Sequence, residues 1–435
     1  MKNKSYNHLY SKSDQAYTRQ SLLYDLNGKS FNLYTFGCKV NQYESERIRQ
    51  ALISRGGRSV NLNENPDIVI INTCTVTAEA DRQCRQMARR ASKLNPGARI
   101  YITGCLLNNP DAISRLPRNV FFLKKEPFLD ELPGKFYAQN RTRALLNIQD
   151  GCNHFCTYCI VPYVRGRSKS RTPGEIIKEA SLLVNKGHRE LVICGIHLGM
   201  YGKDLGNDIT LEKLLYDLSI KFPTTRLRLS SIEPMDLSPG FISAITSISQ
   251  ICPHLHLPLQ HSHPLILKKM KRGYTGEEYA DLINRILRKR PGISLSTDCM
   301  VGFPGEGEEE YEHLYNFIEN MPFMRLHVFS YSPRPMTLAA DLPGQLAPDV
   351  KKRRSKRLLE LGRKKQKKFL DGLMGKYLEV IVEKRFPGGV VRGTGENYAT
   401  VEFHDSEVVP GDMVRVLVTG RHDEICEGII KEKMK

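Results

Sequence analysis

The sequence predicts an α/β protein of several domains: an N-terminal open parallel sheet, a partial barrel of six β/α units, and a small C-terminal antiparallel β-barrel. Hydrophobic strand patterns alternate with helical patterns from residue 31 to about 125, and again from about 144 to 340. Short β-rich runs broken by Gly and Pro then fill residues 375–435. The 435-residue length agrees with several domains, and we place the divisions at 1–30, 31–140, 141–350, 351–372 and 373–435.

The first block predicts a parallel sheet. Its expected elements are strands at 31–36, 67–72, 98–103 and 119–123 and helices near 41–55, 78–94 and 109–116. A cysteine follows each of the first three strands, namely Cys38, Cys74 and Cys105. Because the carboxyl ends of parallel strands lie at the edge where open α/β sheets bind ligands, we expect these thiols to meet. Cys84 falls inside a predicted helix, and we interpret it as structural or incidental.

The second block predicts the partial barrel. Its expected strands are 144–149, 190–194, 226–230, 254–257, 293–300 and 325–331, with helical patterns in the gaps. The helix at 173 opens with a capping box, in which Thr172 is the N-cap, Pro173 the first helical residue and Glu175 the third. Such barrels carry their chemistry at the carboxyl ends of the strands.

Three closely spaced cysteines follow the first strand of this barrel: Cys152, Cys156 and Cys159, in the run GCNHFCTYCIVPYVRGR. Three such thiolates can hold three irons of a cubane iron–sulfur cluster, and a closed cluster would take a fourth cysteine, which the neighbouring sequence lacks. One iron would stay open to bind a substrate or cofactor. The alternatives are a zinc site, which usually needs a second cysteine pair further along, and three unrelated core thiols.

The cysteines of the first block suggest a second three-cysteine cluster with an open iron. The alternative is that the small residues at three equivalent strand ends happen to be cysteine. We favour the cluster, because the topology would bring all three to one edge of the sheet.

The net charge of +18 indicates a polyanionic partner, most simply nucleic acid. Residues 351–370 hold 11 Lys or Arg and one Glu, and they predict a basic helix that joins two domains. The β-rich segment after it predicts a barrel of the size and charge used for RNA binding. The alternatives are a merely solvated helix and a structural cap. The expected RNA contacts are Arg165, Arg167, Lys351, Arg353, Arg354, Lys364 and Lys365.

The first 30 residues are polar and basic and lack the apolar core of a signal peptide. No apolar run approaches the roughly 18 residues that cross a bilayer. We therefore expect a cytoplasmic protein without a membrane partner. Its 11 cysteines are then expected to be reduced thiols or metal ligands rather than disulfides.

The cysteine triplet resembles that of radical S-adenosylmethionine (SAM) enzymes, in which the open iron chelates the amino and carboxylate groups of SAM. Glycine-rich strand ends that would let the backbone approach SAM occur in CGIHLGMYG (194–202) and DCMVGFPGE (298–306). The expected SAM-binding residues are Tyr158, Gly195, His197, Glu233 and Asp298. A further set looks like metal ligands but is interpreted as polar core, because two members alternate with Leu: His254, His256, His261 and His263.

The whole pattern resembles the methylthiotransferases, a radical SAM family with two clusters. The resemblance covers roughly residues 31–433, and its motifs are GCKVNQYES, NTCTVT, TGC, GCNHFCTYCIVPYVRGR, LPLQ and VGFPGE. It implies two [4Fe-4S] clusters, with the triplet at 152–159 binding the SAM cluster and the cysteines of the first block binding the auxiliary cluster. It also implies a C-terminal barrel of the TRAM type. The runs GCKVNQYES and GIHLGMYG are most similar to the branch that modifies threonylcarbamoyladenosine at position 37 of tRNA.

The reaction that this resemblance implies has two halves. One SAM gives a methyl group to a sulfur on the auxiliary cluster, and another gives the radical that takes hydrogen from the adenine C2 carbon, where the methylthio group is then placed. The implied partners are the tRNA anticodon stem-loop, SAM, an electron donor and a sulfur source. Because the clusters and SAM supply the chemistry, no catalytic acid–base pair is assigned. The alternatives are the same chemistry on isopentenyladenosine or on a ribosomal protein, and a non-catalytic zinc- or cluster-bearing RNA-binding protein.

Two positions depart from the family pattern. The run LPLQHSH (257–263) stands where the family usually has LPLQSGS, and Met336 replaces a usual glycine. Neither position is a cluster ligand, and we expect both near the SAM or substrate pocket.

Overall fold

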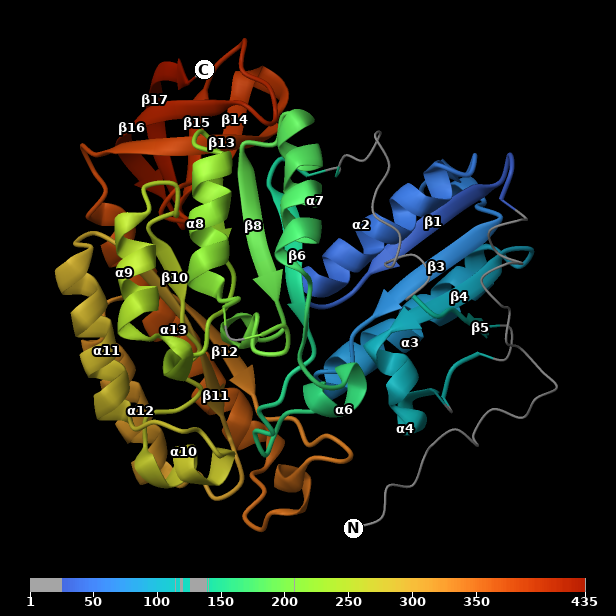
Figure 1. Ribbon diagram of the computed structural model, residues 1–435. Coiled ribbons are helices and arrows are strands. Elements are labelled where there is room, and N and C mark those ends of the chain that lie inside the picture. Colours follow the sequence, from blue (N-terminus) through green and yellow to red (C-terminus); the bar gives the residue numbers. More distant parts are fainter. Residues whose placement is uncertain are drawn as a thin grey trace. The chain divides into compact units, whose positions relative to one another are not determined.

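The computed structural model describes residues 26–113, 115–117, 120–125, 139, 141–206 and 208–434 (Figure 1). The chain divides into two compact units, residues 1–133 and 134–435. The predicted N-terminal extension lies outside the described residues up to position 25. None of the helices in the described ranges combines the length and apolar character that a bilayer crossing requires.

The first unit contains a five-stranded parallel sheet in the order β2-β1-β3-β4-β5. The strands are β1 (Ser30–Thr35), β2 (Arg58–Ser59), β3 (Ile68–Thr73), β4 (Arg99–Gly104) and β5 (Val120–Phe122). The helical segments are α2 (Lys39–Ile53), η1 (Leu62–Glu64), α3 (Ala78–Leu94), η2 (Cys105–Asn108) and α4 (Pro110–Ile113). The predicted parallel sheet is therefore confirmed. The short β2 was not predicted, because two exposed residues carry no hydrophobic period.

Local sequence explains the central elements of this unit. All six residues of β3 are buried, and its run of Val and Ile is typical of a strand covered on both faces. Helix α3 begins after Thr77, whose side chain accepts a hydrogen bond from the Ala80 amide, and acidic Glu79 and Asp81 follow in its first turn. The loop between β3 and α3 is therefore held between a buried strand and a capped helix.

The second unit begins with six parallel strands that form the predicted partial barrel. They are β6 (Ala144–Asp150), β8 (Glu190–Gly195), β9 (Arg226–Leu229), β10 (His254–His256), β11 (Ser294–Val301) and β12 (Phe323–Ser330). Two parallel ladders, β6-β8-β9 and β10-β11-β12, are joined by isolated parallel bridges such as Ser231 with His256. The short β7 (Lys169–Ser170) pairs antiparallel to β6.

Helices follow the barrel strands, and most of them contribute to one apolar core. They are α6 (Val161–Arg165), α7 (Pro173–Asn185), α8 (Leu211–Lys221), α9 (Pro239–Ser247), α10 (Pro264–Met270), α11 (Gly276–Lys289) and α12 (Glu308–Asn320). Shorter 3-10 turns in this part are η3 (Leu198–Met200), η4 (Pro234–Asp236) and η5 (Leu338–Asp341), and η6 (Pro387–Gly389) lies further along the chain, in the C-terminal barrel. The capping box predicted at Thr172 and Glu175 is confirmed at the start of α7.

The basic segment forms α13 (Pro348–Asp371), which starts at a proline in the first helical turn. A closed barrel follows, made of β13 (Tyr377–Arg385), β14 (Val390–Gly395), β15 (Thr400–His404), β16 (Met413–His422) and β17 (Ile425–Met434). The predicted small barrel is confirmed as a closed five-stranded one. Its strand pairing is mixed, because β15 and β17 pair in parallel while the other neighbours are antiparallel.

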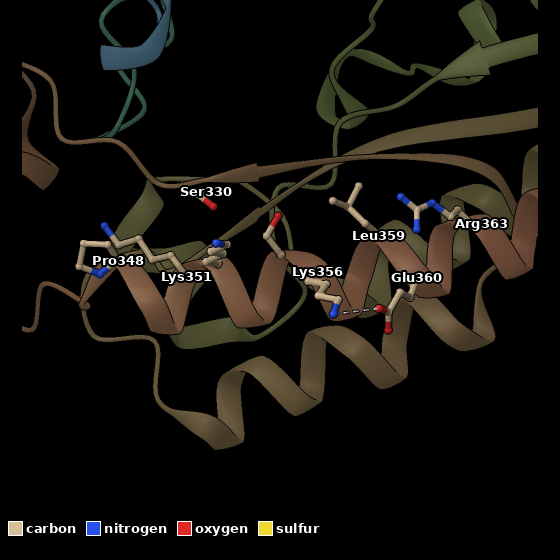
Figure 2. A pocket seen from close by; sticks show the side chains of 9 residues that line it. Ser330, Pro348, Lys351, Lys356, Leu359, Glu360 and Arg363 are labelled. Atoms are coloured by element: carbon tan, nitrogen blue, oxygen red, sulfur yellow. Dashed lines mark ion pairs between the residues drawn. The ribbon is translucent and has the colours of Figure 1, made fainter.

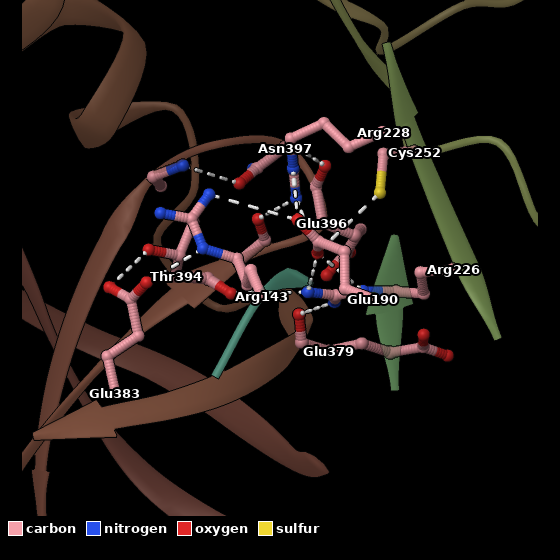
Figure 3. A network of polar contacts seen from close by, with 12 residues as sticks. Arg143, Glu190, Arg226, Arg228, Cys252, Glu379, Glu383, Thr394, Glu396 and Asn397 are labelled. Carbon is pink, nitrogen blue, oxygen red and sulfur yellow. Dashed lines mark hydrogen bonds and ion pairs between the residues drawn. The ribbon is translucent and has the colours of Figure 1, made fainter. Parts of the chain in front are cut away.

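A buried charge network joins this barrel to the partial barrel (Figure 3). Glu190 on β8 lies 2.6 Å from both Arg226 and Arg228 on β9. Arg226 donates to the main-chain oxygen of Glu379 at 2.8 Å, and Arg228 donates to that of Gly395 at 3.1 Å. One carboxylate therefore holds two guanidinium groups that each bind the backbone of the small barrel.

Candidate cluster-binding sites

The first candidate site is the loop between β6 and α6, which contains Cys152, Cys156 and Cys159. Gly151 fixes how this loop leaves the strand. Its φ is +70°, and a Cβ atom there would stand 2.0 Å from the main-chain oxygen of Arg167. Only glycine fits such a close approach. The Cys152 amide then donates to the main-chain oxygen of Gly166 at 3.1 Å. This hydrogen bond joins the start of the cysteine loop to the residue directly after α6.

Two of the three sulfur atoms accept hydrogen bonds from nitrogen donors. The Cys152 sulfur accepts a hydrogen bond from the His154 amide at 3.3 Å and lies 3.3 Å from Nδ1 of His197. The Cys156 sulfur receives Nη1 of Arg272 at 3.5 Å. Donors that converge on sulfur are suited to thiolate ligands, whose charge they partly neutralise. These surroundings therefore fit a cluster held by the cysteines.

His197 is held in place from three sides. Its Nε2 lies 2.5 Å from Oδ2 of Asp236, and its amide donates to the Gln149 side chain at 2.8 Å. Burial lowers the pKa of His197, but contacts with Asp236 and Cys152 outweigh burial and raise it to about 9. The His197 ring therefore lies between the Asp236 carboxylate and the Cys152 sulfur, and both contacts favour its protonated form.

Arg272 is a buried residue that the sequence reasoning missed. Its guanidinium pairs with the Glu233 carboxylate and donates to the Pro258 oxygen at 3.3 Å, in addition to its contact with Cys156. Asp236, the partner of His197, was missed as well. Neither residue lies in a glycine-rich strand end or a cysteine motif, so the sequence carried no signal for them.

The predicted SAM-binding residues lie in three different surroundings. Gly195 ends β8, while His197 and Glu233 follow β8 and β9, at the barrel end where the cysteine loop also leaves β6. Tyr158 packs against an apolar cluster that includes Phe303. Asp298 lies within β11 instead, beside two histidine rings.

The two departures from the family pattern have visible structural effects. His261 of the LPLQHSH run is fully buried, and its Nε2 lies 3.6 Å from Oε2 of Glu306 in the VGFPGE motif. Burial lowers the pKa of His261. Met336 adopts a φ of +68°, a left-handed conformation that favours the glycine it replaces.

Two of the three thiols of the loop, Cys156 and Cys159, have raised pKa values. Burial raises the pKa of Cys156 despite the neighbouring Arg272, and it raises the pKa of Cys159 to about 12. Metal ligation requires thiolates, so cluster binding must release these protons.

The second candidate site lies in the first unit, where three cysteines follow neighbouring strands. Cys38 follows β1, Cys74 follows β3, and Cys105 begins η2 directly after β4. A Cβ atom on Gly37 would stand 2.8 Å from the Cβ of Cys74, so the loop that carries Cys38 lies against Cys74. The predicted placement at one sheet edge is therefore confirmed.

Hydrogen bonds from polar side chains tie the loops and strands of this edge together. Asn41 donates to the main-chain oxygens of Phe36 and Thr73, both at 2.8 Å, and so ties the first cysteine loop to the end of β3. Thr73 donates to the Thr103 oxygen at 2.5 Å, which ties β3 to β4. Cys84 is buried on α3, where burial raises its pKa to about 12, in agreement with a structural role.

Comparisons with known proteins match both halves of the chain. Residues 30–122 match the uncharacterized protein family UPF0004, and residues 146–318 match the radical SAM superfamily. A Bacillus subtilis protein, threonylcarbamoyladenosine tRNA methylthiotransferase MtaB, is 36% identical over 92% of this chain and 98% of its own length. The chain belongs to the radical SAM methylthiotransferase family.

Other relatives of this methylthiotransferase carry a different substrate in their names. A tRNA-2-methylthio-N(6)-dimethylallyladenosine synthase of Thermoanaerobacter pseudethanolicus is 34% identical over 94% of both chains. Among solved structures, the radical SAM methyltransferase TsrM of Kitasatospora setae has a TM-score of 0.53 and 15% identity, covering 72% of this chain and 75% of that one. That likeness shows the fold alone.

The basic helix of the methylthiotransferase has two different faces. Its outer face lines a pocket with the end of β12, formed by Ser330, Pro348, Lys351, Lys352, Ser355, Lys356, Leu359, Glu360 and Arg363 (Figure 2). Lys356 pairs with Glu360 at 4.0 Å, so the remaining side chains give this pocket a net positive charge.

The residues predicted to contact RNA differ in exposure. Arg353, Lys364 and Arg167 are exposed. Lys365 is partly buried and donates to the Glu319 oxygen at 2.8 Å, and Lys351 donates to the Tyr331 oxygen at 3.1 Å.

Two predicted RNA contacts are directed inward. Arg354 is buried and binds Glu306 at 2.7 Å and Glu308 at 2.9 Å. The Arg165 side chain is also buried and binds Asp150 at 2.8 Å. Both guanidinium groups therefore act inside the protein, which charge counting along the sequence could not reveal.

Proposed function

We propose that this methylthiotransferase acts on tRNA and converts N6-threonylcarbamoyladenosine at position 37 to its 2-methylthio derivative. The observation that carries the reaction class is the pair of three-cysteine sites, each at the carboxyl edge of its own parallel strands. The B. subtilis relative named for this nucleoside supports the choice of substrate. The relatives named for dimethylallyladenosine make that nucleoside the second candidate.

The residues of the β6–α6 loop fit a [4Fe-4S] cluster, which Cys152, Cys156 and Cys159 would hold. The fit rests on the nitrogen donors that converge on two of the sulfur atoms. A cluster held by three cysteines, together with SAM, supplies the radical and methyl-transfer chemistry that the family name describes. Cys38, Cys74 and Cys105 would hold the second cluster.

The protein's own part in this chemistry is to position and shield these groups. The ring of His197, oriented by Asp236, places a nitrogen beside the Cys152 sulfur. The guanidinium of Arg272, oriented by Glu233, does the same beside Cys156. Because both cysteines are buried, water has little access to their sulfur atoms.

The proposed binding of tRNA rests on the outer face of α13. Lys352, Lys356 and Arg363 are among the residues that line the pocket on this face, and Glu360 is the one acidic residue of that lining. Lysine and arginine side chains spaced along one helix can neutralise successive phosphates of an RNA backbone. A ribosomal protein substrate would not need this charge.

Nucleoside mass spectrometry tests the proposal. Anaerobically reconstituted protein is incubated with SAM, a reductant, sulfide and tRNA that carries threonylcarbamoyladenosine. We expect a methylthio mass gain on that nucleoside, and none on a parallel tRNA that carries isopentenyladenosine. Gain on the second tRNA alone would move the substrate to isopentenyladenosine. SAM cleavage without gain on either would keep the radical core and point to a protein substrate.

Cysteine variants separate the two sites. Replacing the cysteines at 152, 156 and 159 with Ala should abolish SAM cleavage and leave tRNA affinity largely unchanged. Replacing Cys38, Cys74 and Cys105 with Ala should leave SAM cleavage but no sulfur insertion. Sulfur insertion by the second variant would refute the auxiliary-cluster assignment. Zinc in place of iron, with no SAM cleavage by the unaltered protein, would favour a non-catalytic RNA-binding protein.

A further inference from the structure

Three potential metal ligands lie side by side on the last three strands of the partial barrel. His256 is on β10, Asp298 on β11 and His327 on β12. Asp298 and His327 are direct partners in the β11–β12 register. One ligand atom from each side chain lies within 4.8 Å of the other two. The sheet therefore brings together residues that are up to 71 positions apart in sequence.

The carboxylate oxygen at the centre of this group is not satisfied by hydrogen bonds. Oδ1 of Asp298 lies 3.1 Å from Nε2 of His256 and 3.2 Å from Nδ1 of His327. Yet this buried atom has no hydrogen-bond partner of acceptable geometry among the described residues. It thus makes ion-pair contacts with two ring nitrogens, at angles that do not meet the geometry of a hydrogen bond.

These separations are those of ligands around one small cation. Zn²⁺ bonds to imidazole nitrogen and carboxylate oxygen are about 2.0–2.2 Å long, so neighbouring ligand atoms in a tetrahedron lie about 3.3–3.5 Å apart. The two measured separations are slightly shorter and need only a small adjustment. Two imidazoles and one carboxylate are also the donor set that zinc and ferrous iron accept, whereas calcium and magnesium prefer oxygen alone.

A hydrogen bond behind the group orients one of the rings. Nδ1 of His256 lies 2.9 Å from the Ser296 hydroxyl, so its Nε2 is the nitrogen that faces Asp298. The same hydroxyl lies 2.9 Å from Nε2 of His254. Metal-binding histidines are commonly fixed in this way by a partner on the other ring nitrogen.

We propose that His256, Asp298 and His327 bind one divalent transition-metal cation, such as zinc or ferrous iron, at a site separate from both cysteine clusters. The site contains no sulfur ligand and lies on three strands that carry none of the cluster cysteines. The His327 side chain is 47% exposed, so one side of the cation is open to water or to an oxygen of a bound molecule. Asp298, predicted from sequence to bind SAM, becomes a metal ligand.

The competing interpretation is a simple ionic cluster in which protonated histidines neutralise Asp298. Burial raises the pKa of this carboxyl, but its contacts with His256 and His327 outweigh burial and lower it. An ionic cluster and a metal site both account for that direction. Direct measurement of metal binding separates them.

Cobalt(II) binding to the full-length protein, measured after both clusters have been reconstituted, tests the proposal. Cobalt is distinguished from cluster iron by elemental analysis, and ligation by nitrogen and oxygen lacks the sulfur-to-cobalt charge-transfer band that cysteine ligation would give. We expect about one cobalt per chain, bound without that band, as a three-residue site requires. His327→Ala, which removes a half-exposed ring, should weaken binding at least ten-fold.

Two further variants test whether the cobalt binds at this site. Asp298→Asn keeps the volume of the side chain and should weaken cobalt binding by a similar factor. His422→Ala removes a histidine that lies 2.9 Å from Glu427 on the small barrel and should leave binding unchanged. Equal binding by the unaltered protein and by both ligand variants would overturn the proposal, as would no cobalt binding by the unaltered protein. Neither result depends on methylthio transfer.

Discussion

Replacing Glu190 with Gln tests the charge network between the two barrels of the second unit. Glu190 is 0% exposed and lies between Arg226 and Arg228. Removing one partner of such a buried ion pair costs about 3–5 kcal/mol, because it leaves uncompensated charge inside the protein. Burial raises the pKa of Glu190, but the two arginines outweigh burial and lower it from 4.5 to about 2. That shift corresponds to about 3 kcal/mol, in agreement with the first range.

Urea denaturation measures this loss. We expect Glu190→Gln to lower the free energy of unfolding by about 3 kcal/mol at pH 7. Because the folded-state pKa is depressed, the stabilising effect is fully present above pH 4.5 and is lost as the pH falls towards 2. The difference between the two proteins should therefore shrink over that acidic range.

An exposed pair provides the matched control. Glu312 pairs with Arg357 at the surface, between α12 and α13. Glu312→Gln should cost at most about 1 kcal/mol, because solvent screens such pairs. The reasoning is refuted if Glu190→Gln costs no more than this control, or if its cost does not change between pH 7 and pH 3.

Three further changes have definite expected results. Burial outweighs the nearby Arg226 and raises the pKa of Glu396 from 4.5 to about 7, so this carboxyl contributes stability below pH 4.5 that is lost as the pH rises through 7. Glu396→Gln should remove this loss, of at most about 3 kcal/mol, in free energies of unfolding from urea denaturation at pH 4 and pH 8. Gly151→Ala should sharply lower the iron content after reconstitution, whereas Gly166→Ala, at a similar φ of +79° but in open space, should lower it little. Arg272→Gln should change the electron paramagnetic resonance spectrum of the reduced SAM cluster while tRNA affinity stays the same; an unchanged spectrum would remove Arg272 from the site.

Much of the fold was accessible from the sequence, because parallel strands buried on both faces leave continuous apolar runs. The run at 67–72 and the six barrel strands are examples. The placement of the cysteines at the carboxyl ends of parallel strands could also be predicted, because each set follows strands of this kind. The spacing of the cysteines along the chain and the order of the strands both predicted the same two three-cysteine sites.

The rest depended on contacts between distant residues. Arg354 looks like one more cation of a basic helix, and only its position opposite Glu306 shows that it is buried. Asp298 lies in a glycine-rich motif, which suggested SAM, yet its neighbours His256 and His327 come from other strands. The parallel pairing of β15 with β17 likewise follows from how the barrel closes, and no local pattern encodes it.

Part of the joint between the two barrels uses main-chain atoms of the small barrel. Arg226 and Arg228 bind backbone oxygens of Glu379, Gly395 and Glu396 rather than their side chains. Every amino acid supplies such an oxygen, so substitutions at these three positions would leave the hydrogen bonds in place. The side chain of Glu383, which pairs with Arg143 at 2.7 Å, is a contact that substitution would remove. The identity of the residues at the three main-chain positions is therefore free of this constraint, whereas the joint depends on the side chains of Arg226, Arg228 and Glu190.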